Sequence, residues 1–170
     1  FETNSLPSAL ILFAWSALLA ASSEVLRRVE SQARYYLPAL LASLPGFAFA
    51  VISGFAHDIW LGFAVTLAIA ALFTALHILH SRWWLWTLAL LNAIIAYFAF
   101  FNFEFIEKLD IHGSYIVTLL TFLLLLPDLL LPKDWKLNLT WRLPVRIYAG
   151  FFTVFLSLGL LVPGESLHSG

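Results

Sequence analysis

Long runs of apolar residues alternate with short charged segments along the whole chain. The uncharged runs occupy 3–23, 35–57, 59–81, 83–103, 111–127 and 147–164. A helix needs roughly 20 apolar residues, within a range of about 17–25, to cross the hydrocarbon core of a bilayer, and every run reaches that range. None of the runs alternates like a strand, and lipid offers no partner for an unpaired backbone group. Each run is therefore predicted to be helical.

The pattern predicts a single all-α integral membrane domain over 1–170, a polytopic transmembrane helix bundle of five or six spans. The second span is an open choice, because its prolines and glycines also suit a re-entrant helix that does not cross. A short amphipathic helix at the membrane surface is predicted near 22–37, capped by Ser22 or Ser23. The predicted spans lie near 5–22, 36–56, 59–80, 83–103, 113–132 and 144–163.

Composition supports a membrane protein and narrows its chemistry. Hydrophobic residues make up 62% of the chain, charged residues 11%, and the mean hydropathy is +0.92, whereas soluble domains carry about 25% charged residues. The net charge of −1 gives no basic field for nucleic acid. The chain contains no cysteine, which excludes disulfides, thiolate metal sites and cysteine nucleophiles.

The distribution of lysine and arginine predicts the orientation of the spans. Segments 24–34 and 133–146 and the turn at Arg82 are basic, and basic short loops stay in the cytoplasm. The His57–Asp58 turn, the 104–112 segment and the C-terminus are then extracytoplasmic. A five-span arrangement would place 24–57 along the outer face and move the N-terminus across the membrane, and it would leave everything after Asp58 unchanged. The expected location is a bacterial cytoplasmic (inner) membrane.

The predicted outer face gathers most of the polar residues that could form a site. These candidates for a lipid head-group or domain-docking surface are Asp58, Glu104, Glu107, Asp110 and His112. Carboxylates and an imidazole can hold an ammonium group or a hard cation, although no metal spacing is present. The alternatives are a solvated loop over 104–112 and an N-cap at Asp58, where a carboxylate also complements the helix dipole.

The remaining polar residues do not form a catalytic pattern. His77 and His80 lie one helical turn apart near the predicted cytoplasmic end of their span, where they suit an interfacial pair beside Arg82 better than a metal site. The chain contains no Gly-rich phosphate loop, no HExxH and no ordered Ser–His–Asp set. We therefore predict no catalytic residue, metal ligand or cofactor within the chain, and enzymatic activity stays open.

Three stretches resemble a known family. "SGFAHDIWLGFAVTLAIAAL" (53–72), "LLNAIIAYFAFFNFEFIEKLDIHGSYIV" (90–117) and "LTWRLPVRIYAGFFTVFLSLGLLVPG" (139–164) are similar to the membrane domain of sulfatase-like transferases. That family includes lipoteichoic acid synthases and phosphoethanolamine transferases. The resemblance implies about five spans followed by an extracytoplasmic domain of the alkaline phosphatase superfamily with a threonine nucleophile and divalent metal. Those catalytic residues have no matching positions here, because the chain ends at Gly170.

The resemblance implies a function for the outer face. The chain would hold a lipid substrate at the outer leaflet for a phospho-head-group transferase whose catalytic domain lies outside these residues. The alternative is a non-catalytic integral membrane subunit of a larger complex, with a partner subunit in place of that domain. A small transporter or channel is disfavoured, because the polar residues inside the spans are few and uncharged: Thr66, Thr74, Asn92, Thr118 and Thr121.

Overall fold

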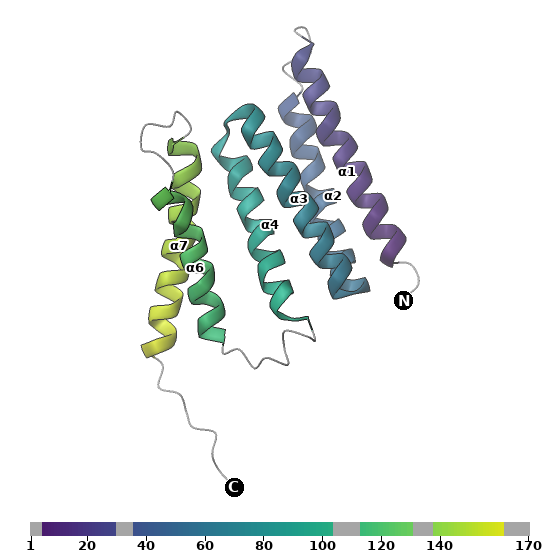
Figure 1. Ribbon diagram of the computed structural model, residues 1–170. Helices are drawn as coiled ribbons and strands as arrows, with labels where there is room; N and C mark the ends of the chain where they lie inside the picture. The colour runs from purple at the N-terminus through teal and green to yellow at the C-terminus, as the bar shows by residue number, and fades with distance from the viewer. Residues whose placement is uncertain (1–4, 30–35, 104–112, 131–137, 162–170) are drawn as a thin grey trace.

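The computed structural model of the chain describes residues 5–29, 36–103, 113–130 and 138–161. These residues form helices that run alternately up and down (Figure 1). The helices are α1 (Ser5–Arg28), α2 (Tyr36–His57), α3 (Ile59–His80), α4 (Trp83–Phe101), α6 (Gly113–Leu130) and α7 (Asn138–Leu161). Within α1 to α4, the segments Ser8–Arg28, Leu37–His57, Ile59–His80 and Trp83–Phe101 are long and apolar enough to cross a membrane, and Gly113–Leu126 in α6 is a shorter apolar helix. The predicted all-α membrane bundle is confirmed.

The alternation of the helices gives the bundle two ends. The end that we call the Arg28 end holds the last residues of α1, α3 and α6 and the first residues of α2, α4 and α7 (upper side of Figure 1). The opposite end, which we call the Asp58 end, holds the start of α3 and the last turn of α4. The polar residues at these two ends of the bundle differ.

The predicted surface helix over 22–37 is wrong for the part that the structure describes. Residues 22–28 continue α1 without a break. Ser22 and Ser23 donate their hydroxyl hydrogens to the carbonyls of Leu18 and Ala20 within α1, and so they do not cap a new helix. Residues 30–35 lie outside the described residues. The segment proposed as re-entrant is one continuous helix, α2, which contains Pro45.

The first four helices pack around one apolar core at interfaces of small residues. Ser16 of α1 lies against Gly46 of α2, so close that a Cβ at position 46 would overlap with the Ser16 hydroxyl. At the turn into α3, a Cβ at Gly54 would lie 3.2 Å from the Cα of Gly62. Small residues permit such close approach of helix backbones, which is how helices gain packing energy in lipid. Phe47 and Phe73, 3% and 1% exposed, fill the centre of this core.

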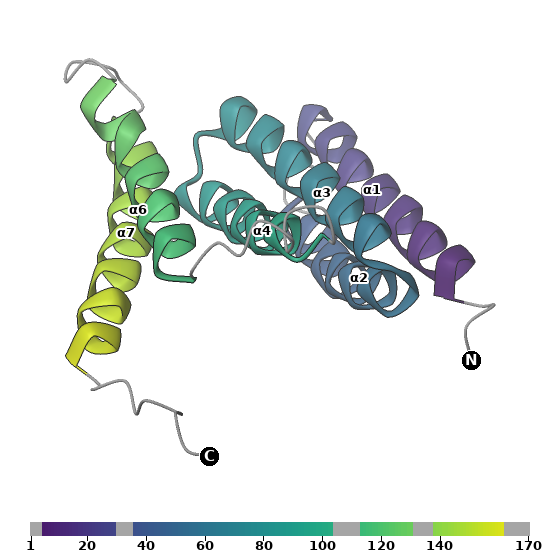
Figure 2. The same cartoon turned by 60° about the horizontal axis from the view of Figure 1, so that its bottom comes forward.

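A second apolar core lies between α4, α6 and α7, and Trp86 packs against both cores. Three hydrogen bonds tie these helices together. The indole N–H of Trp86 donates to the carbonyl of Trp141 in α7 at 3.0 Å. The hydroxyls of Tyr97 and Tyr148 donate to the carbonyls of Ile116 and Thr87, at 2.6 and 3.3 Å. Figure 2 shows the result, with α6 and α7 paired beside α4 and apart from α1.

Candidate functional site

Asp58 is an exposed N-cap of α3. Its backbone is extended, and its carboxylate accepts a hydrogen bond from the backbone N–H of Trp60. A carboxylate at this position satisfies one of the backbone donors that a helix start leaves unpaired, and it complements the positive end of the helix dipole. Asp58 therefore caps α3, which is one of the alternatives that the sequence left open. The cap engages one carboxylate oxygen, and the other accepts no hydrogen bond from the described residues.

A group of four aromatic rings lies at the Asp58 end of the bundle. We call it the aromatic cluster, and it consists of Trp60, Phe63, Phe100 and Phe103. The indole of Trp60 stacks on Phe103 with ring centroids 3.9 Å apart and planes 14° apart. Phe103 is 2% exposed, whereas Trp60 is 57% exposed. One side of the indole is therefore covered, and a large part of Trp60 is exposed at the Asp58 end.

The other predicted members of the outer surface, Glu104, Glu107, Asp110 and His112, lie outside the described residues. The structure does place the residue before them. Phe103 stacks on Trp60, and Trp60 follows Asp58 by two positions. The start of the 104–112 segment and the start of α3 are thus at the same end of the bundle. Whether the acidic side chains approach Asp58 stays a prediction.

The two histidines do not act as a pair, because they contact different helices. His77 is fully buried, with Nδ1 2.9 Å from the carbonyl oxygen of Arg82 and its ring 4.6 Å from that of Trp141. His80 instead faces α1, where its Nε2 lies 3.0 Å from Oε2 of Glu24. Within the described part of the chain, no group of three or more His, Asp or Glu side chains could hold a metal ion.

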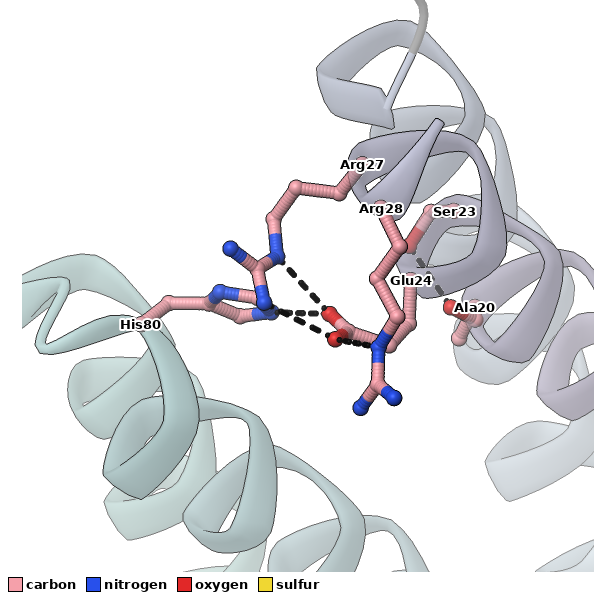
Figure 3. A network of polar contacts seen from close by, with 6 residues as sticks. All are labelled: Ala20, Ser23, Glu24, Arg27, Arg28 and His80. Atoms are coloured by element: carbon pink, nitrogen blue, oxygen red, sulfur yellow. Dashed lines mark hydrogen bonds and ion pairs between the residues drawn. The ribbon is translucent and has the colours of Figure 1, made fainter. Parts of the chain in front are cut away.

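The structure adds Glu24, which the sequence analysis did not single out. Its carboxylate accepts hydrogen bonds from Arg27 and Arg28 of its own helix at 2.9–3.0 Å and also contacts His80 of α3 (Figure 3). The pairing of Glu24 with these arginines could be predicted from the sequence, because acidic and basic residues three and four positions apart lie on one face of a helix. The contact with His80 could not be predicted, because it joins residues far apart in sequence. This network holds α1 to α3 at the Arg28 end.

No protein-family model, no curated protein and no solved structure matches the chain. The similarity to sulfatase-like transferases therefore stays a prediction from the three quoted stretches. Function has to be argued from the side chains themselves. Of the predicted site residues, Asp58 is the one that lies among the described residues, and it caps the helix whose second residue, Trp60, has an exposed side chain.

Proposed function

We propose that the chain is a membrane domain that holds a phospholipid with an ammonium head group at its Asp58 end, for a catalytic domain or subunit outside the spans. The observations that carry this proposal are an exposed carboxylate at Asp58 and an exposed indole at Trp60, two positions later at the same end of α3. The Asp58 end is proposed to face away from the cytoplasm, as the basic residues at the Arg28 end favour.

A carboxylate beside an indole suits an ammonium group. The carboxylate offers a charge-assisted hydrogen bond, and the face of a tryptophan ring attracts a cation that lies within about 6 Å of its centroid. Phe103 supports the ring from one side at 3.9 Å, which fixes its orientation at little further entropic cost. Among the described residues, only one oxygen of Asp58 accepts a hydrogen bond, so capping α3 and binding a cation are compatible.

The depth of this pair also suits a phospholipid head group. Asp58 precedes the first residue of α3, a helix of 22 residues, which is about 33 Å long at 1.5 Å per residue. A helix of this length spans a hydrocarbon core of about 30 Å, so its first residue lies at the level of the head groups. Tryptophan is enriched at that level because its ring is apolar and its N–H is polar.

The same geometry supports a separation between lipid binding by this chain and catalysis by another domain or subunit. The described residues contain no cluster of metal-ligating side chains, and we propose that the chemistry is done by another domain or subunit. Glu104, Glu107, Asp110 and His112 would then contact that domain or complete the head-group site. The alternative of a non-catalytic subunit of a larger complex uses the same surface, but for a protein rather than for a lipid.

The proposal is tested by Asp58→Asn, because asparagine keeps the cap and removes the charge. We would reconstitute the full chain in nanodiscs of equal phosphatidylethanolamine and phosphatidylglycerol and count the retained lipids by native mass spectrometry. The wild type should retain phosphatidylethanolamine preferentially. Asp58→Asn should lower that preference about two- to fivefold, the range of an exposed charge or cation–π contact. Trp60→Leu should lower it similarly.

A wild type without preference, or an Asp58→Asn variant with the full preference, would contradict lipid binding at this pair. A second assay addresses the transferase itself. In the intact protein from its native membrane, Glu104→Ala together with Glu107→Ala should lower head-group transfer while leaving membrane insertion unchanged. Unchanged turnover would favour the non-catalytic subunit.

A further inference from the structure

A groove in the middle of the bundle holds a polar side chain whose hydrogen-bonding capacity is only partly used by the described residues. The groove has a volume of about 360 Å³ and lies between α2 and α4, with Phe73 of α3 among its lining residues. Its α2 side runs from Leu44 to Ile52 and its α4 side from Leu88 to Ile95. It reaches the surface of the bundle, since Ile52 and Leu91 are 62% and 41% exposed. Asn92 is the one polar side chain that lines it.

The amide of Asn92 is only partly satisfied. Its Nδ2 donates one hydrogen bond to the carbonyl of Leu88, one turn earlier in α4, at 2.9 Å. Among the described residues, nothing bonds to its Oδ1 or to its second N–H. A carboxamide can accept two hydrogen bonds and donate two. Leaving this capacity unused in hydrocarbon costs free energy, so whatever fills the groove should supply a donor and an acceptor.

The depth of Asn92 decides which occupant can do so. Asn92 lies nine residues from each end of α4, or about 14 Å at 1.5 Å per residue, which is the middle of a hydrocarbon core about 30 Å thick. The acyl chains of phospholipids carry no hydrogen-bonding group at that depth. A transmembrane helix with a polar side chain at its midpoint does, and asparagine is one of the residues that hydrogen-bond across helices in membranes.

We infer that the groove is the contact surface of a homodimer, in which α4 of a second copy packs against it and the two Asn92 amides bond to each other. A second copy has the same orientation in the membrane. A twofold axis along the membrane normal therefore brings the two Asn92 side chains to the same depth, as an isologous contact requires. A carboxamide is both donor and acceptor, so two of them are self-complementary. The apolar residues on either side of Asn92 supply the surrounding packing.

The absence of cysteine from the chain allows a direct test. In the full chain in liposomes, Leu91→Cys places one thiol at the rim of the groove next to Asn92. Copper phenanthroline should produce a covalent species of twice the 19.1 kDa mass of the chain, and its yield should persist as the protein is diluted in lipid. The matched control is Phe151→Cys, which lies near the middle of α7 and is 62% exposed to the outside of the bundle. It should produce little of this species.

Adding Asn92→Leu to the Leu91→Cys chain tests the amide pair. Leucine fits an apolar surface, so the fold is retained, and the dimer constant should fall about three- to tenfold, the range for a hydrogen bond between membrane helices. Asn92→Gln should recover part of the loss. Equal yields from Leu91→Cys and Phe151→Cys, a yield that Asn92→Leu leaves unchanged, or a covalent product of another mass would each overturn the homodimer. These outcomes are independent of the phosphatidylethanolamine preference that tests the proposed function.

Discussion

The first four helices and the last two are held together by different kinds of contact. Helices α1 to α4 meet through small residues, with Ser16 against Gly46 and Gly54 against Gly62, around buried phenylalanines. The pair α6 and α7 is attached to α4 by aromatic side chains that donate hydrogen bonds to backbone carbonyls. The close packing of α1 to α4 depends on residues with little or no side chain. The attachment of α6 and α7 to α4 depends on individual hydrogen-bond donors of aromatic side chains.

This difference predicts how each region responds to mutation. An interface of small residues has no room for an added side chain, so one substitution should disturb the whole four-helix unit. An interface built on separate hydrogen bonds should weaken in steps as each donor is removed.

Gly46→Leu should have the largest effect. Even the first carbon of the new side chain would overlap with the Ser16 hydroxyl, so α1 and α2 have to separate. We expect a loss of about 3 kcal/mol or more in the free energy of unfolding, measured by titration with SDS in bicelles, since overpacking a core typically costs about 1–3 kcal/mol and sometimes more.

The control for that substitution is Gly150→Leu in α7. A Cβ at Gly150 would meet no atom within 4 Å, and leucine has a higher helix propensity than glycine by roughly 0.5–1 kcal/mol. This variant should be as stable as the wild type or slightly more so. Equal destabilisation by both substitutions would show that close packing of α1 and α2 is not what distinguishes the two regions.

Trp86→Phe should loosen α7 from α4 by about 1–2 kcal/mol. The substitution removes the donor to the Trp141 carbonyl, and such bonds in membranes contribute about 0.6–1.7 kcal/mol, to which lost ring area adds. Ala149 is 2% exposed in the core that α7 shares with α4. The maleimide labelling rate of Ala149→Cys should therefore rise about five- to thirtyfold.

Two control variants show whether the loosening is confined to the contact between α4 and α7. Ala50→Cys, at a fully buried position of the first core, should label at an unchanged rate in the Trp86→Phe chain. Trp83→Phe, at a position 54% exposed, should change neither rate. Faster labelling of Ala50→Cys in the Trp86→Phe chain would mean that the two regions open together.

The smallest effect is expected at the Glu24 network. A double-mutant cycle of Glu24→Gln and His80→Gln should give a coupling energy of about 0.2–1 kcal/mol, as for other ion pairs near water. The coupling should change little as salt rises, because the Glu24 and His80 side chains are only 14% and 8% exposed. Arg28→Gln, at a side chain 70% exposed, should change stability less than Glu24→Gln. A coupling energy of zero at low salt would show that the network does not hold α1 to α3.

The presence of helices could be predicted from the sequence, because every backbone group in lipid has to bond within its own segment. Their ends could be predicted only in part, since α1 extends six residues beyond the predicted 5–22 span and α7 begins six residues before the predicted 144–163 span. The predicted 59–80 span matches α3, and the predicted 83–103 span extends two residues beyond α4. The predicted surface helix failed at 22–28. There Glu24 pairs with Arg27 and Arg28 along α1, and these contacts support a continuous helix rather than a new one.

The candidate site was only partly predictable. Asp58 could be recognised as a cap from its place between two apolar runs. The stacked ring of Trp60 could not, because Trp60 stacks on Phe103, which follows the end of α4 and is far away in the sequence. In the same way, Asn92 was visible only as one uncharged polar residue among several. The unused capacity of its amide becomes apparent once α2 and α4 are placed on either side of the groove.

A head-group site at Asp58 requires the Asp58 end of the bundle to face outward. Val29→Cys and Ala56→Cys place single thiols at exposed positions of the Arg28 end and the Asp58 end. In right-side-out vesicles, a membrane-impermeant maleimide should label Ala56→Cys at once and Val29→Cys only after permeabilisation. Labelling of both from outside would support five spans. Labelling of Ala56→Cys only from the inside would contradict the account.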